Sequence, residues 1–248
     1  MRDFEQKVFQ FIESEHLVNE GSRLLIACSG GVDSMALLTF FDKYKKVLGI
    51  ELFVAHVDHM LRGEQSAGDR IFVEQFCEVR GIPCFSTAIP IPKILAEHGG
   101  NSQAVCRKER YAFFTKIMQE QAIDTLVTAH HADDQLESIL MGLAKAGTIT
   151  GMQGIHVKRL FAKGIVIRPF LMVTKDEIRE YLQKSGVSFR EDASNEKDDY
   201  TRNRFRHHVV PPLRRKMNLL HNMQRSFQCN LCRMMHICDS LHNRHLSV

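Results

Sequence analysis

The sequence has no apolar run approaching the roughly 18–20 residues that span a membrane, which excludes a transmembrane helix. Its first 15 residues mix charged and apolar side chains, so they hold no apolar core of a signal peptide. Prolines are few, 6 in 248 residues, and no internal repeat is present. With 44% hydrophobic and 25% charged residues, the composition excludes disorder and collagen-like or low-complexity scaffolds. We therefore expect a soluble, cytoplasmic protein with one large α/β domain and an appendage, or two small domains.

The seven cysteines are odd in number and scattered, which does not indicate a disulfide framework. Four of them are expected to be small buried hydrophobic residues: Cys28, Cys77, Cys84 and Cys106. The other three lie within residues 228–238, where a C-x-x-C pair followed by His236 offers zinc ligands. That segment lacks a second C-x-x-C pair, and the composition changes abruptly there. We therefore favour a non-native or frameshifted C-terminus over a metal module.

Net charge is modest, at +4, but it is unevenly distributed along the chain. From residue 201 to the end there are nine Lys or Arg residues and one acidic residue. The first 200 residues therefore carry 24 basic and 28 acidic residues, or −4, and the last 48 carry +8. A slightly acidic body with a basic end is typical of nucleic-acid contact, but a solvated basic tail has the same charge pattern.

Short apolar runs alternate with amphipathic segments of ten or more residues. Buried strands are predicted at 24–28, 51–57, 83–89, 124–129 and 165–170. Helices are predicted at 33–47, 69–80, 101–121, 133–143 and 174–185, the last beginning with a capping box of Thr174 and Glu177. Residues 147–154 are rich in Gly and Thr and are expected to form a loop. This order predicts an α/β fold with a doubly wound parallel sheet.

The sharpest motif lies between the first predicted strand and its helix, and it consists of Ser29, Gly30, Gly31, Val32, Asp33 and Ser34. Two glycines let the backbone turn tightly and approach an oxyanion, while serine hydroxyls and helix N-terminal amides donate to it. Asp33 would repel phosphate unless it holds a Mg²⁺ ion that bridges the phosphates. The alternative is a plain strand–helix turn in which Ser29 or Asp33 is only an N-cap. Neither a dinucleotide-binding glycine motif nor the lysine of the Walker loop is present.

This motif resembles the S-G-G-x-D-S pyrophosphate loop of the N-type ATP pyrophosphatases, a superfamily with a Rossmann-like fold. Four further strings, at residues 55–63, 101–111, 129–138 and 191–206, narrow the resemblance. They read AHVDHMLRG, NSQAVCRKERY, AHHADDQLES and, in two parts, EDASN and YTRNRFR. Together, over about residues 20–215, they are similar to the bacterial tRNA(Ile)-lysidine synthetase family.

The resemblance implies an ATP-dependent ligation. The wobble cytidine in the CAU anticodon of isoleucine tRNA is adenylated on its C2 carbonyl oxygen, and the lysine ε-amine then displaces AMP. It implies that ATP and Mg²⁺ bind the loop residues Ser29 to Ser34 together with His56, with Asp33 as the magnesium ligand. Arg107 and Arg110, three apart on a helix, would clamp phosphate or the cytidine. Asp133 and Glu137, four apart, would receive and deprotonate the lysine ammonium.

The basic end is expected to bind tRNA through four arginines: Arg202, Arg206, Arg214 and Arg215. The expected organisation is a catalytic domain at residues 1–215 and a short, helical, basic extension that ends in a tail at 216–248, non-native or truncated. The expected partners are isoleucine tRNA, lysine and ATP, with no membrane, and a homodimer is compatible with the sequence.

Two alternatives remain open at this point. A tRNA thiolase of the same superfamily needs an activated cysteine or an iron–sulfur cluster, and the cation-rich segment offers only Cys106, with no C-x-x-C partner. The other alternative is a nucleotide-binding regulator without catalysis, which the complete Ser29–Ser34 motif and its charged partners disfavour.

Overall fold

The computed structural model describes residues 2–146, 153–191 and 205–210. The chain divides into two compact units, each treated by itself below. The first comprises Met1–Ala132 and Val157–Asp192, and the second comprises Asp133–His156 and Ala193–Val248. Among the described residues, no helix is long and apolar enough to cross a membrane.

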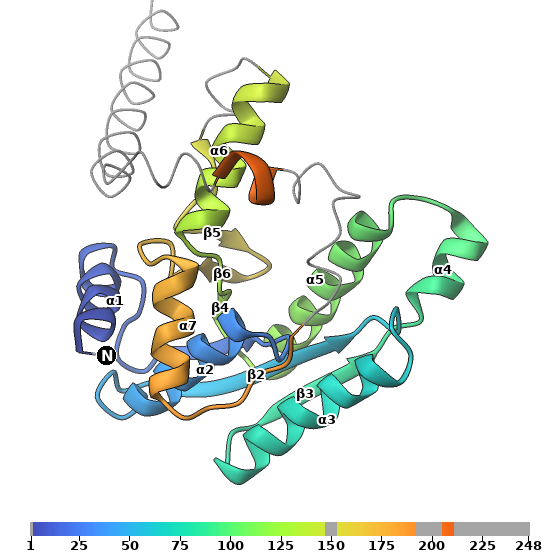
Figure 1. Cartoon of the computed structure of the whole chain (residues 1–248). Helices are drawn as coiled ribbons and strands as arrows, with labels where there is room; N and C mark the ends of the chain where they lie inside the picture. The colour runs from blue at the N-terminus through green and yellow to red at the C-terminus, as the bar shows by residue number, and fades with distance from the viewer. Residues whose placement is uncertain (1, 147–152, 192–204, 211–248) are drawn as a thin grey trace, which may run out of the picture. The chain divides into compact units, whose positions relative to one another are not determined.

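The first unit is built on a six-stranded sheet with the order β3-β2-β1-β4-β6-β5 (Figure 1). The strands are β1 (Arg23–Ala27), β2 (Glu51–Asp58), β3 (Cys84–Ala88), β4 (Thr125–Val127), β5 (Lys158–Phe161) and β6 (Gly164–Ile167). All neighbouring pairs are parallel except β5 and β6, which form an antiparallel hairpin at the edge. Leu24, Leu25 and Ile26 of β1 are fully buried, because a central parallel strand is covered on both faces.

Helices cover both faces of this sheet. They are α1 (Arg2–Ser14), α2 (Val32–Tyr44), α3 (Glu64–Val79), α4 (Ile91–His98), α5 (Ser102–Glu120) and α7 (Lys175–Lys184). Right-handed crossovers from β1 to β2 to β3 and then back to β4 place α2 and α3 on one face and α5 on the other. On the α5 face, Phe114, Ile117 and Met118 pack on apolar strand residues such as Leu25 and Leu126. On the other face α7 packs against α2, and α1 packs against α7.

Strand order reverses at β1, which pairs with β2 on one side and with β4 on the other. The connections leaving β1 and β4 therefore diverge at the carboxyl edge of the sheet, the position at which open α/β sheets bind ligands. Residues 28–31 lie at this point and lead from β1 into α2. The sequence motif with two glycines thus occupies the ligand-binding position of the fold.

The predicted α/β fold is confirmed, with each expected strand and helix within a few residues of its predicted range. The structure adds elements that were not predicted: α1, α4 and the antiparallel strand β5. The predicted loop lies mostly outside the described residues, at 147–152, and so does nearly all of the basic extension, where only Phe205–Val209 is seen, as one π-helical turn. The second unit is otherwise described by α6 (Ala132–Ala146), which begins in the first unit, and by residues 153–156.

Candidate functional site

The glycine loop after β1 has a backbone that only small residues allow. Gly30 has φ = 87°, in the left-handed region, where a side chain would be strained. A Cβ atom at Gly30 would also lie 3.4 Å from Val73 Cγ2, so α3 closes the space behind the loop. Gly31 is the N-cap of α2 and supplies no side-chain cap, which leaves the first amides of the helix to be satisfied by another group. A helix N-terminus of this kind favours an anion.

Two serine hydroxyls are joined across this loop. Ser34 Oγ donates to the Gly31 carbonyl oxygen at 3.0 Å and accepts from the Ser29 amide at 3.1 Å. The two hydroxyl oxygens lie 3.2 Å apart, and because the Ser34 hydrogen is used on Gly31, Ser29 is the donor of this pair. Ser34 thereby fixes the loop from inside, while Ser29 retains a donor that can turn toward a phosphate oxygen.

Asp33 is the second residue of α2 and does not cap it. Its Oδ2 atom lies 3.3 Å from Lys175 Nζ and 3.9 Å from His131 Nε2. Its Oδ1 atom is buried and has no hydrogen-bond partner among the described residues. A buried carboxylate oxygen without a donor is costly unless a cation or another donor reaches it. Asp33 therefore fits the role of a Mg²⁺ ligand through Oδ1, with the remaining ligands supplied by phosphate and water.

His56, on β2, contacts the backbone directly before the glycine loop. Its Nδ1 atom lies 2.9 Å from the Cys28 carbonyl oxygen, which only accepts, so Nδ1 carries the proton. The side chain is 3% exposed, and this burial lowers the pKa of His56, which keeps the ring neutral. Nε2 is a buried acceptor without a hydrogen-bond partner among the described residues. His56 thus holds the end of β1 in place and offers one acceptor.

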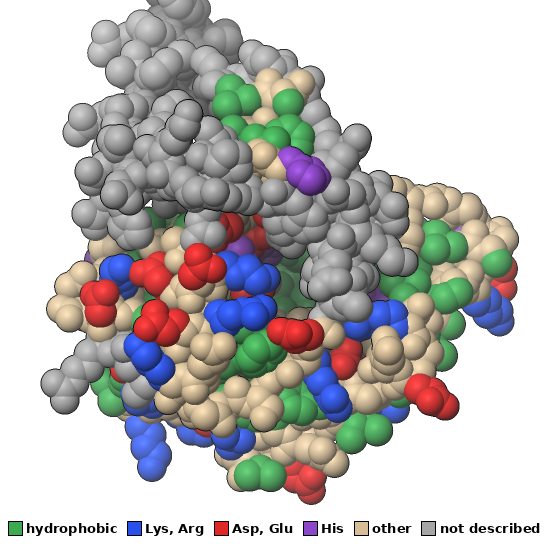
Figure 2. All heavy atoms as spheres, viewed as in Figure 1, with side chains coloured by type: hydrophobic (Ala, Val, Ile, Leu, Met, Phe, Trp, Pro, Cys, Tyr) green, Lys and Arg blue, Asp and Glu red, His purple; other side chains and the backbone are tan. Residues whose placement is uncertain are grey.

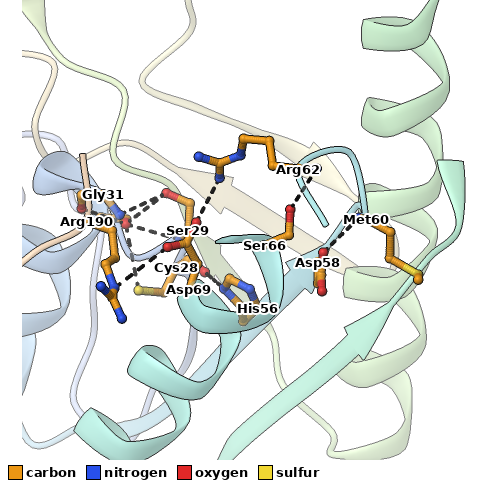
Figure 3. A network of polar contacts seen from close by, with 11 residues as sticks. Cys28, Ser29, Gly31, His56, Asp58, Met60, Arg62, Ser66, Asp69 and Arg190 are labelled. Carbon is orange, nitrogen blue, oxygen red and sulfur yellow. Dashed lines mark hydrogen bonds and ion pairs between the residues drawn. The ribbon is translucent and has the colours of Figure 1, made fainter. Parts of the chain in front are cut away.

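Arg190, which follows α7, holds the outer side of the loop (Figure 3). Its amide donates to the Gly30 carbonyl oxygen at 2.9 Å, and its backbone forms an isolated parallel bridge with Gly31. Its guanidinium lies 3.8 Å from Asp69 of α3, and Arg62 contacts the same carboxylate at 2.8 Å. The glycine loop is therefore held between α3 and the segment after α7.

Of the two α5 arginines, Arg110 is half-buried and Arg107 is exposed. Burial lowers the pKa of Arg110, and the neighbouring charge of Arg107 adds to this, although a guanidinium stays charged. Burial and the charge of Arg110 lower the pKa of His59 to about 4, so His59 is neutral at pH 7. The string after β2 and the string that opens α5, far apart in sequence, thus meet at the carboxyl edge of the sheet.

The predicted acidic residues lie in the second unit, on α6. Glu137 is fully buried, and Asp133 and Asp134 are each 9% exposed. Asp133 and Glu137 share one helix face through their four-residue spacing. Of the predicted tRNA-binding arginines, Arg202, Arg214 and Arg215 lie outside the described residues, and Arg206 is described only through its backbone. The cysteines of the tail also lie outside the described residues, and among the others no cluster of His, Cys, Asp and Glu is arranged as a metal centre.

Sequence reasoning missed Lys175 and Arg190, which contact the loop from elsewhere in the chain. Lys175 is the first residue of α7, whose capping box is visible in the sequence. Its position at a helix N-terminus could therefore be predicted, but its contact with Asp33 could not. His131 lies in the string at residues 129–138, and its Nε2 atom is 3.9 Å from Asp33 Oδ2. Over the face seen in Figure 2, acidic and basic side chains are interspersed, as on an ordinary solvated surface. Charge clustering therefore does not mark a binding surface on that face.

A doubly wound sheet with an anion-binding glycine loop at its switch point defines an α/β nucleotide-binding protein. More particularly, the chain belongs to the PP-loop family of ATP-binding domains, whose model, the PP-loop domain, matches residues 1–213. It is 44% identical over 215 residues to the tRNA(Ile)-lysidine synthase of Geobacillus kaustophilus, and 41% identical over 220 residues to that of Bacillus subtilis. Each match covers 87% of this chain and 46% of the relative. The chain thus spans about half the length of the curated relatives it matches.

Solved structures agree on the fold. The U34-tRNA thiolase NcsA from Methanococcus maripaludis has a TM-score of 0.73 at 15% identity, covering 93% of this chain and 78% of that one. The NMN synthetase from Francisella tularensis has a TM-score of 0.51 at 14% identity, covering 92% and 95%. At such identities the likeness is one of fold alone.

Proposed function

We propose that this protein ligates lysine to C2 of the wobble cytidine in the CAU anticodon of isoleucine tRNA, in the cytoplasm and at the expense of ATP. The observation that carries the proposal is its similarity to proteins named tRNA(Ile)-lysidine synthase across the PP-loop domain, together with an intact glycine loop. In the first step the cytidine O2 atom attacks the α-phosphorus of ATP and pyrophosphate leaves. In the second, the lysine ε-amine attacks C2 and AMP leaves with that oxygen.

For the first step, the amides at the start of α2 and the Ser29 hydroxyl bind the β- and γ-phosphates that depart as pyrophosphate. Asp33 would hold Mg²⁺, which neutralises phosphate charge, and its unpartnered Oδ1 supports that role. Lys175, 3.3 Å from Asp33, adds a positive charge beside the same phosphates. Arg107 and Arg110 neutralise phosphate or steady the cytidine, because adenylyl transfer depends mainly on positioning and charge.

For the second step, Asp133 and Glu137 receive the lysine ammonium and take up its proton, because only the neutral amine is a nucleophile. Their four-residue spacing supports this assignment, since it places both carboxylates on one helix face, where they can reach one ammonium. Asp134 lies in the first turn of α6, and we assign it to stabilising the helix N-terminus instead of binding the amine.

For the tRNA, the proposal assigns Arg202, Arg206, Arg214 and Arg215 to phosphate contacts, with residues 1–215 as the catalytic domain and 216–248 as a tail. A homodimer belongs to the same proposal, and sedimentation with and without tRNA tests it.

The thiolase alternative is disfavoured by the state of the cysteines near the site. Sulfur transfer needs a thiolate, whereas burial raises the pKa of Cys106 and raises that of Cys28 to about 11. Both residues remain thiols at pH 7 and lack the activation that a sulfur carrier needs.

The decisive experiment measures incorporation of labelled lysine into isoleucine tRNA transcripts with a CAU anticodon, with a GAU-anticodon transcript as control. ATP–pyrophosphate exchange is followed in parallel, with and without tRNA. Lysine incorporation into the CAU transcript alone supports the ligase. ATP–pyrophosphate exchange without lysine incorporation would indicate that a nucleophile other than lysine displaces AMP. The absence of both activities would favour a non-catalytic nucleotide-binding protein.

A further inference from the structure

Two cysteines, Cys77 and Cys84, lie beside each other where α3 packs on β3. Cys77 is in the last turn of α3, Cys84 is the first residue of β3, and residues 78–83 connect them. This connection turns back tightly, because the Ile82 amide donates to the Cys77 carbonyl oxygen at 3.0 Å and Gly81 has φ = 62°. The turn brings the two side chains together, and the Cys77 thiol donates a hydrogen bond to the Cys84 sulfur. Both residues are free thiols in this structure.

The two thiols differ in their access to solvent. Cys77 is fully buried, whereas Cys84 is partly exposed. Among the described strands, β3 is at the edge of the sheet and pairs with β2 alone, so Cys84 begins a strand with one open side. The expected burial of four cysteines is thus found for Cys28 and Cys77, but not for Cys84 and Cys106. A small reactant in water can reach Cys84 before it can reach Cys77.

The hydrogen bond makes the acidities of the two thiols unequal. It lowers the pKa of Cys84 below its ordinary value, because it stabilises the thiolate more than burial and the charge of Glu74 oppose it. The same bond, together with burial, raises the pKa of Cys77. Cys84 is therefore the nucleophile of the pair, and Cys77 keeps its proton. An accessible thiol of lowered pKa beside a second thiol that can resolve its oxidised form is typical of redox-active cysteine pairs.

We propose that Cys77 and Cys84 are a modification site, at which a hydroperoxide converts the two thiols into a disulfide. The Cys84 sulfur attacks one oxygen of hydrogen peroxide and the O–O bond breaks, which leaves Cys84 as a sulfenic acid and releases water. The Cys77 sulfur then attacks the Cys84 sulfur, and the hydroxyl group leaves as water with the Cys77 proton. The two thiols together lose two electrons and two protons, and the peroxide is reduced to two molecules of water. A dithiol reductant reverses the reaction by thiol–disulfide exchange.

The disulfide would tie the C-terminal end of α3 to the edge strand of the sheet. A disulfide forms without backbone movement only where the Cα atoms lie within about 7 Å, and thiols in hydrogen-bond contact across a tight turn meet this condition. The same helix lies behind the glycine loop, through the contact of Val73 with Gly30. The inference goes beyond the proposed ligation and does not depend on it, since neither cysteine is assigned to ATP, lysine or tRNA.

Peptide mapping of the full chain tests the site, because trypsin cleaves after Arg80, between the two cysteines. The protein is treated with hydrogen peroxide, the remaining thiols are blocked with N-ethylmaleimide, and the denatured chain is digested without reductant. The expected product is a linked pair of peptides, residues 71–80 and 81–93, which dithiothreitol separates. Cys28 is the competing partner, since the Cys84 thiolate raises the pKa of Cys28 through its charge. A link between peptides 24–43 and 81–93 would therefore overturn the assignment of Cys77.

The rate of oxidation provides a comparison within the wild-type chain. Cys106 is also partly exposed, but burial raises its pKa. Cys84 should therefore lose its free thiol about tenfold faster than Cys106 at low peroxide, because one unit of pKa changes the thiolate fraction about tenfold. Equal rates at Cys84 and Cys106 would overturn the proposal, and so would peroxide treatment that leaves Cys77 and Cys84 blocked by maleimide.

Two variants separate the roles of the cysteines. In Cys77→Ser, which a thermal melt first shows to be folded, Cys84 should stop at the sulfenic acid, and dimedone should trap it on peptide 81–93. Cys106→Ser is the matched control and should form the linked peptides as the wild type does. Dimedone labelling of Cys84 in the wild type without any linked pair would overturn the resolving role of Cys77. The wild-type peptide map needs no variant, so the proposal stays testable if Cys77→Ser does not fold.

Discussion

The Lys175 ammonium lies 3.3 Å from Asp33 Oδ2, although 142 residues separate the two in sequence. Asp33 is in the first turn of α2 and Lys175 begins α7, so this ion pair joins the N-termini of two helices that pack on each other. Both helix ends favour anions. A polyphosphate bound at the glycine loop would therefore lie near the N-terminus of α7 as well as that of α2. The ammonium of Lys175 would partly offset the repulsion between Asp33 and that phosphate.

Asp33→Asn should keep the fold and lose ATP–pyrophosphate exchange, because the amide has nearly the same volume but does not replace the carboxylate as a cation ligand. A loss of about 100-fold or more, ~3 kcal/mol, is expected from removing a ligand of this type. Asp42→Asn on the same helix is the matched control, since Asp42 pairs only with Lys45 and Arg80 among described residues. Near wild-type exchange by Asp33→Asn would remove Asp33 from the reaction.

Lys175→Gln should weaken ATP binding about tenfold, the ordinary effect of losing one charge-assisted hydrogen bond. Lys184→Gln serves as its control, because Lys184 ends the same helix and pairs with Glu180 at the surface. Titration of a fluorescent ATP analogue in the presence of Mg²⁺ measures the difference. Equal ATP affinities for the two variants would limit Lys175 to holding α7 against α2.

Glu137→Gln should raise the lysine requirement of ligation more than the ATP requirement, because it preserves shape while removing the charge that attracts an ammonium. Steady-state ligation at varied lysine and varied ATP separates the two, and a thermal melt establishes that the buried substitution folds. Asp134→Asn, on the same helix, is expected to leave the lysine dependence unchanged. An unaltered lysine dependence in Glu137→Gln would contradict its assignment to the amine.

Glu177 should make stability depend on pH. Burial would raise its pKa, but hydrogen bonds from Lys7 and Thr174 outweigh this and lower the pKa below the ordinary 4.5. The stabilisation is therefore complete above about pH 4.5 and is lost as the pH falls through the lower pKa of the folded state. Glu177→Gln can still cap α7 but loses the ion pair with Lys7, so it should cost up to about 1 kcal/mol of unfolding free energy at pH 7 and should flatten the acid limb of the curve. Urea melts from pH 3 to 7 measure it, with Glu180→Gln as an exposed control of smaller effect.

Short-range sequence patterns were enough to predict the glycine loop and the elements on either side of it. The run Leu24–Ala27 is apolar because β1 is buried on both faces, and a buried strand that ends in two glycines and leads into a helix has few alternatives. The capping box of Thr174 and Glu177 was likewise readable, since all its hydrogen bonds fall within four residues. These features depend on neighbouring residues, and the sequence pattern carries them directly.

Contacts between residues far apart in the sequence could not be predicted from such patterns. Strand β5 is four residues long and mostly exposed, so it lacks the apolar alternation that marks a strand, and it exists because it pairs with β6. Arg159, whose Cζ atom lies 6.0 Å from the centre of the Tyr111 ring, could not be brought there without that hairpin. Arg190 contacts Gly30 through its backbone amide, which any residue but proline could supply. Which residue performs such a contact is decided by tertiary packing, and a single sequence holds no trace of it.

The hydrogen bond between the Arg190 amide and the Gly30 carbonyl oxygen joins two segments that are synthesised at different times. Arg190 is translated 160 positions after Gly30, which at about 5–20 residues per second takes roughly 10–30 s. The residues of the central strands and α2 are therefore synthesised well before the segment after α7 that contacts the glycine loop. We expect a nascent chain to carry the glycine-loop sequence before its contact with residue 190 can form, and to reach full affinity for nucleotide only after that contact forms. Nucleotide binding during translation would report completion of this domain.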